Sequence, residues 1–228
     1  MQQTNDAYIL TDFQLQFLLM GIKCSSLYGL PQNKFNGNFE ELYYQIYDLA
    51  VRQILKSSEY AFEICEPLKS WFLAVADADA VLHIMASGRP PRAFCAYLSD
   101  KKVVVMERYV YQKFSIRMSG YQKVDFYEEI RKILESCGIR EPNEPLPKEM
   151  ITDELADLRQ HLRKEYQKKN YEMPEKFCVE ISSLAGVCKK RISVIRYCLE
   201  NYLVAEEGQT LDLFFFEMSK LAELLENT

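Results

Sequence analysis

Four short apolar runs follow one another in the middle of the chain with only turns between them. They cover Ala80–Met85, Ala93–Leu98, Lys102–Val110 and Phe114–Met118. In the last run Phe114 and Ile116 alternate with Ser115 and Arg117. Such alternation predicts an antiparallel β-meander with one face in the core and the other exposed or covered by a partner.

Helical patterns precede these runs. Thr11 followed by Gln14 has the spacing of a capping box and predicts a short helix that ends near Gly21. Asn38 is placed to cap a helix over Phe39–Lys56. The apolar residues of that helix predict that it lies in the core: Leu42, Tyr43, Ile46, Tyr47, Leu49, Ala50 and Ile54.

Further elements surround the meander. We expect a short strand around Phe62, a helix over Leu68–Ala76 and a closing helix over Phe126–Cys137 that stops at Gly138. The three prolines between Ile139 and Glu149 indicate a linker. We therefore predict an α+β domain over 1–138, a linker over 139–150 and a separate C-terminal region over 151–228.

The C-terminal region has apolar residues at helical spacing. Two seams consist of Ile151, Leu155, Leu158 and Leu162, and of Leu211, Phe214, Met218, Leu221 and Leu225. Glu175–Leu184 and Lys189–Leu203 predict two more helices between them. The expected fold class is α+β, an antiparallel β-meander flanked by helices with a C-terminal helical bundle.

Composition narrows the function classes. The net charge is −5, and acidic residues outnumber basic ones on both sides of residue 150. This balance argues against a nonspecific nucleic-acid or membrane-surface binder. The apolar run Phe13–Ile22 is short and lacks a preceding basic segment, so we expect no membrane insertion, no signal peptide and a cytoplasmic location.

Catalytic and metal-binding patterns are missing from the sequence. The seven cysteines contain no C-x-x-C pair, and His83 and His161 have no third histidine. Asp77 and Asp79 could form a carboxylate pair, but aspartate is also common at a helix-to-strand turn. We expect a non-enzymatic protein without a metal, a cofactor or a small-molecule substrate.

Residues 175–216 allow a second interpretation. A helix, a turn at Gly186, a helix that begins with Lys189 and Lys190, and a hairpin across Gly208 have the order of a winged-helix DNA-binding module. Glu206 and Glu207 would repel DNA at the wing, so nucleic acid is the less favoured partner.

One face of the predicted meander has the composition of a protein-binding surface. Tyrosine and arginine side chains are enriched at such surfaces. The candidate partner-binding residues are Tyr97, Arg108, Tyr109, Tyr111, Lys113 and Arg117. An ordinary solvated sheet face is the alternative.

The order of elements from Asn38 to Cys137, with Val103-Val104-Val105 and Phe114-Ser115-Ile116-Arg117 in the meander, resembles the EspG-type chaperones of type VII secretion and their EsaE-like counterparts. The resemblance implies a non-enzymatic cytosolic chaperone or adaptor that binds a secreted helical-hairpin protein or effector. A toxin-binding immunity protein is an alternative that the sequence does not separate from a chaperone.

Overall fold

A computed structural model gives the structure of the chain. It describes residues 7–22, 38–58, 61–100, 102–109, 111, 115–141, 155–158, 160–161, 164, 176–197, 200–208 and 210–226. In these ranges, no helix combines the length and the apolar character needed to cross a membrane.

The chain folds into two compact units, each assembled from discontinuous segments. The first unit contains Met1–Leu82, Ala93–Phe126 and Ser183–Val187. The second contains His83–Arg92, Tyr127–Ser182 and Cys188–Thr228. The predicted linker over 139–150 lies mostly outside the described residues, so the boundary predicted there stays a prediction.

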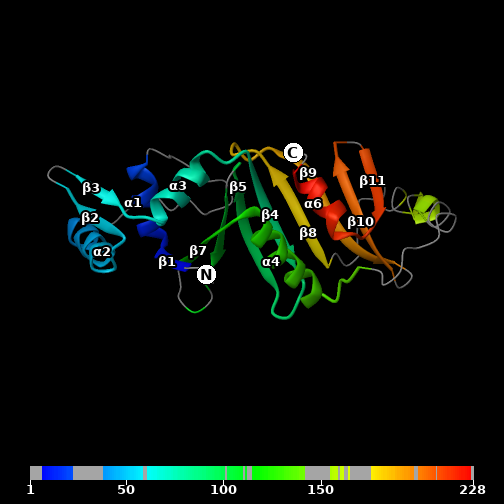
Figure 1. Ribbon diagram of the computed structural model, residues 1–228, viewed down its shortest axis with the longest axis horizontal. Coiled ribbons are helices and arrows are strands. Elements are labelled where there is room, and N and C mark those ends of the chain that lie inside the picture. Colours follow the sequence, from blue (N-terminus) through cyan, green and yellow to red (C-terminus); the bar gives the residue numbers. More distant parts are fainter. Residues whose placement is uncertain are drawn as a thin grey trace. The chain divides into compact units, whose positions relative to one another are not determined.

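The strands of the first unit follow the order β1-β7-β6-β5, and β4 begins in this unit and continues into the second (Figure 1). Their bounds are β1 (Ala7–Thr11), β4 (Ala80–Ala86), β5 (Arg92–Leu98), β6 (Val103–Arg108) and β7 (Ser115–Tyr121). Antiparallel pairing of β5 with β6 and of β6 with β7 confirms the predicted meander. Strand β1, which the sequence analysis did not predict, pairs with β7 and forms the edge.

Three helices complete the first unit: α1 (Asp12–Gly21), α2 (Phe39–Val51) and α3 (Leu68–Ala76). The capping box of Thr11 and Gln14 is confirmed, since the backbone N–H of each residue donates to the side chain of the other. The side chain of Asn38 caps α2 by accepting from the N–H of Glu41 at 2.8 Å. Both caps satisfy backbone donors that would otherwise lack partners.

Helix α3 supplies two large aromatic side chains to the first unit's core. Phe72 is fully buried and Trp71 is 6% exposed. The Trp71 ring contacts Tyr8 edge-on, with ring centroids 5.5 Å apart, and lies directly against Gly120 of β7. A side chain at position 120 would collide with the indole, so this glycine permits the close approach of helix and strand.

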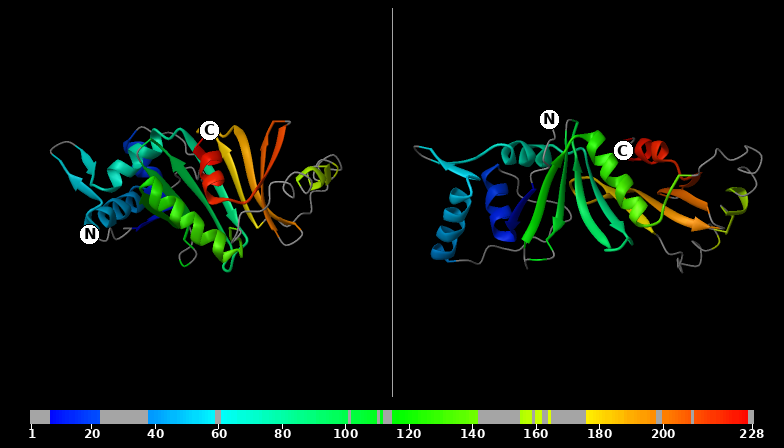
Figure 2. Two further views of the ribbon diagram at one scale, coloured as in Figure 1. Left: turned by 45° about the vertical axis from the view of Figure 1, so that its right-hand side comes forward. Right: turned by 60° about the horizontal axis from the view of Figure 1, so that its bottom comes forward.

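Helix α2 ends earlier than the predicted limit of Lys56. Gln53 has a positive φ of 57°, which stops the helix, and a small hairpin of β2 (Leu55–Ser57) and β3 (Phe62–Ile64) follows. Figure 2 shows α2 beside α1, with the hairpin at the C-terminal end of α2. Strand β3 confirms the predicted strand around Phe62.

The structure of the second unit differs from the predicted C-terminal helical bundle. Its main feature is an antiparallel meander of β8 (Phe177–Ser182), β9 (Cys188–Tyr197), β10 (Glu200–Glu207) and β11 (Thr210–Phe215). The predicted helices over Glu175–Leu184 and Lys189–Leu203 are therefore wrong. Strand β9 pairs on both sides and buries the consecutive residues 192–195, so its apolar positions do not alternate.

Because those two segments are strands, the winged-helix hypothesis is wrong. The segment that would be its recognition helix is strand β9. Lys190 Nζ donates to the carbonyl oxygen of Leu224 at 3.2 Å, and Arg191 Nε lies 3.2 Å from Cys178 Sγ. These basic residues are part of the sheet and do not present a helix to a DNA groove.

Helices α4 (Lys123–Ser136) and α6 (Met218–Glu226) accompany the strands of the second unit. Most of α4 belongs to this unit, as does α6. Gly138, with φ of 71°, confirms the predicted stop after α4. Tyr127 Oη donates to Glu226 Oε1 at 3.1 Å; burial, together with this carboxylate, raises the pKa of Tyr127.

Candidate protein-binding surfaces

The register of the first unit's sheet separates two of the predicted binding residues. Val104 and Met106 of β6 lie in the core cluster with α1 and α3, so Arg108 shares their face. Arg117 of β7 is the cross-strand partner of Glu107 and lies on the opposite face. The expectation that the two arginines lie together is corrected, because neighbouring positions on a strand point to opposite sides.

Arg108 binds within the protein. Its Nη1 lies 2.7 Å from Oδ1 of Asp12, the first residue of α1. The carboxylate is 9% exposed and the guanidinium 46% exposed. Arg108 therefore connects the end of β6 to α1.

The other predicted residues also differ in position. Tyr97 is wholly buried in the core cluster and cannot lie on a binding face. Tyr111 is 89% exposed, and its ring contacts Tyr109 with centroids 5.6 Å apart. Lys113 lies outside the described residues. Tyr111 and Arg117 are both exposed, and their role in binding stays a prediction.

The largest exposed apolar surface of the first unit lies on α2. Phe39, Tyr43, Tyr47 and Val51 repeat every four residues and are 91, 68, 60 and 61% exposed, and Tyr44 beside them is 61% exposed. This spacing places them along one side of the helix. We call these five residues the α2 aromatic stripe.

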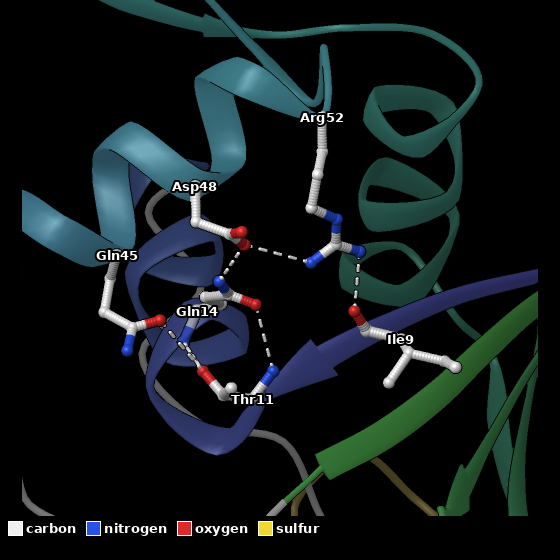
Figure 3. Close-up of polar contacts among 6 residues, drawn as sticks. All are labelled: Ile9, Thr11, Gln14, Gln45, Asp48 and Arg52. Carbon is white, nitrogen blue, oxygen red and sulfur yellow. Dashed lines mark hydrogen bonds and ion pairs between the residues drawn. The ribbon is translucent and has the colours of Figure 1, made fainter. Parts of the chain in front are cut away.

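The opposite side of α2 attaches the helix to the rest of the unit through polar contacts (Figure 3). Asp48 Oδ2 accepts from Gln14 Nε2 at 2.9 Å and lies 3.3 Å from Arg52 Nη1. Arg52 Nη2 donates to the carbonyl oxygen of Ile9 at 2.7 Å. Gln45 Oε1 accepts from Thr11 Oγ1 at 3.4 Å. The polar side of α2 therefore faces β1 and α1, and the aromatic side faces outward.

This orientation corrects the prediction that Tyr43 and Tyr47 are core residues. Within α2, only Leu49 is buried. The sequence did contain a signal for the stripe, namely the four-residue repeat that begins at Phe39. Apolar periodicity alone could not show which side of the helix meets the protein.

Asp77 and Asp79 lie beside a shallow depression of about 500 Å³ at the end of α3. Its lining also includes Ser70, Asp100 and Lys102, whose Nζ donates to Ser70 Oγ at 3.0 Å. The N–H of Asp77 closes α3, and the N–H of Asp79 donates to the carbonyl oxygen of Leu98 at 2.8 Å. The described residues hold no cluster of histidine, cysteine and carboxylate side chains able to bind a metal.

Comparison with known proteins gives a match among solved structures. No family model and no curated protein matches this sequence. A solved structure does match: the Mycobacterium tuberculosis type VII secretion system chaperone EspG5, in complex with the PE25–PPE41 dimer. The match covers 97% of this chain and 95% of EspG5, with a TM-score of 0.56 and 8% sequence identity.

The two chains share a fold. The α+β class with a large antiparallel sheet is thereby confirmed. At this level of identity the likeness concerns the backbone, so it assigns no residue of EspG5 to a position of this chain. EspG5 itself is described as a chaperone of type VII secretion.

Proposed function

We propose that this protein is a non-catalytic cytoplasmic chaperone or adaptor that binds a helical-hairpin secretion substrate of a type VII-like system. The observation that carries the proposal is the fold shared with EspG5 over nearly the full length of both chains. EspG5 was solved with a PE25–PPE41 dimer bound. A secretion substrate that waits for export exposes apolar surface, and a chaperone covers such surface without chemistry.

The surfaces of this chain support the same proposal. Exposed tyrosine and phenylalanine are enriched where proteins bind one another. Twelve large hydrophobic residues are exposed in the described part of the chain, and five of them form the α2 aromatic stripe. The first unit therefore concentrates the apolar surface that a chaperone needs.

The test is capture from the native host in buffer containing 1 M salt, followed by removal of the gene. We expect a small helical secreted protein to stay bound in high salt and to become insoluble when this chain is absent. Retention of a toxin whose activity is blocked would identify an immunity protein instead. If no helical secretion protein is retained, the proposed function is wrong.

A further inference from the structure

We propose that the α2 aromatic stripe is the docking site for one amphipathic helix of the substrate. This inference rests on the proposed function and assigns its binding surface to α2. The stripe runs from Phe39 to Val51, which at 1.5 Å per residue is about 18 Å of helix. A partner helix of three to four turns matches this length, and side chains at four-residue spacing form a ridge that fits between those of a second helix.

The exposed area favours such a partner. An aromatic side chain covers about 150–250 Å² when it packs, so the four aromatic residues and Val51 leave roughly 600 Å² available on one side of α2. The largest apolar patch on a typical monomer is about 300–600 Å². A stable complex needs about 800 Å² from each partner, so two copies that meet through this stripe alone would fall short. A helical hairpin reaches further, because its second helix contacts surface beside α2.

Charge also separates a substrate helix from a second copy. Glu40 lies on the outer side of α2 between the aromatic residues, and it is exposed. The outer side of this helix carries no basic residue, so a second copy would offer Glu40 no cation from its own stripe. A substrate helix would complement the stripe with its own apolar side. It would complement Glu40 if it placed one lysine or arginine beside the N-terminal end of α2.

The stripe is already rigid in the unbound chain. The Asn38 cap fixes the first turn of α2, and the contacts of Asp48 and Arg52 fix its position on α1 and β1. Binding therefore requires little ordering of the helix, which lowers the entropic cost of association.

Site-specific cross-linking tests this inference in the full-length chain in its native host. Tyr47 is replaced by the photoreactive p-benzoylphenylalanine, an aromatic residue of related shape, and the same replacement at Tyr111 reports on the predicted sheet surface. We expect position 47 to cross-link to one face of a helix in the captured secretion protein. Cross-links from position 111 and none from 47, or cross-links from 47 only to a second copy, would overturn the inference and leave the proposed function standing.

A binding measurement with the captured protein completes the test. Tyr43→Ser combined with Tyr47→Ser removes two exposed rings, and we expect the dissociation constant to rise about tenfold or more. Val124→Ser changes a 74% exposed residue of α4 and should leave affinity unchanged. An unchanged affinity in the double variant contradicts docking on α2. If the parent chain binds no helical secretion protein at all, the proposed function fails, and the inference fails with it.

Discussion

Helices α2 and α3 both carry large aromatic residues, yet α3 buries them and α2 exposes them. Phe72 of α3 is 0% exposed, whereas Phe39 of α2 is 91% exposed. Helix α3 meets the sheet through apolar side chains, including Trp71 against Gly120. Helix α2 meets α1 and β1 through Asp48, Arg52 and their hydrogen bonds. Whether an aromatic residue of a helix lies in the core or on the surface depends on which side of that helix contacts the rest of the protein.

The difference has a physical basis in the cost of burying polar groups. Gln14 of α1 is only 2% exposed, and its Nε2 donates to Asp48 Oδ2, so the polar side of α2 supplies the acceptor that this buried amide needs. Turning the aromatic stripe inward would move Asp48 away from Gln14 and leave the amide without that acceptor.

A matched pair of substitutions in α3 and α2 should give the largest difference in stability. Phe72→Ala should lower the free energy of unfolding by about 3–5 kcal/mol, because it removes a fully buried ring and leaves a cavity. Phe39→Ala removes the same ring from an exposed site and should change stability by no more than about 0.5 kcal/mol. Urea denaturation measures both. Equal losses would show that α2 is covered in the folded protein.

Gly120→Ala probes the close packing of α3 on the sheet. The added methyl group would collide with the Trp71 ring, and such overpacking costs about 1–3 kcal/mol. Gly21→Ala is the control, since no atom lies within 4 Å of the position that its Cβ would take. Thermal unfolding should separate the two variants; identical melting temperatures would argue against the tight contact.

Asp48→Ala weakens the attachment of α2 without touching its aromatic side. Gln14, which is 2% exposed, would lose the acceptor for its Nε2, and an unsatisfied buried amide costs about 1–2 kcal/mol. Faster hydrogen exchange of the α2 amides would locate the effect. Asp48→Asn keeps an acceptor oxygen and should lose less. Unchanged exchange in Asp48→Ala would mean that other contacts hold this helix.

Cys95 offers the smallest and most local test of the core beneath α3. Burial raises the pKa of its thiol from 9.0 to about 11, whereas Cys188 is exposed. The thiolate is the reactive form, so iodoacetamide at pH 8.5 should label Cys188 well before Cys95. The folded-state pKa is raised, so the stability from this thiol is complete below pH 9 and is lost as the pH rises through 11. Equal labelling rates at the two positions would show that the core is open to solvent.

Local signals in the sequence predicted several helix ends well. The Thr11 capping box, the Asn38 cap and the Gly138 stop each depend on a few neighbouring residues, and the structure confirms all three. The alternation at Ile116 and Arg117 likewise predicts a strand, and in β7 Ile116 is buried while Arg117 is exposed. These features need no knowledge of distant partners, so sequence reasoning reaches them.

Features that depend on distant partners were missed. Both faces of strand β9 are covered from Ile192 to Ile195, because these four consecutive residues are all buried, and no two-residue period appears. The seam from Leu211 to Leu225 proved to span strand β11 and helix α6, which happen to share a spacing. The face occupied by Arg108 follows from the register of the sheet, and the exposure of Tyr47 follows from the side on which α2 contacts the protein. Hydrophobic periodicity predicts neither.

The turn at Ser183–Val187 belongs to the first unit although it comes near the end of the chain, and Leu184 packs against the first unit's core. During synthesis, the ribosome must therefore reach Val187 before this unit has all of its parts. A nascent chain that has emerged only to residue 140 lacks that turn. We expect a chain released before Val187 to be a better target for proteases than one that extends past it.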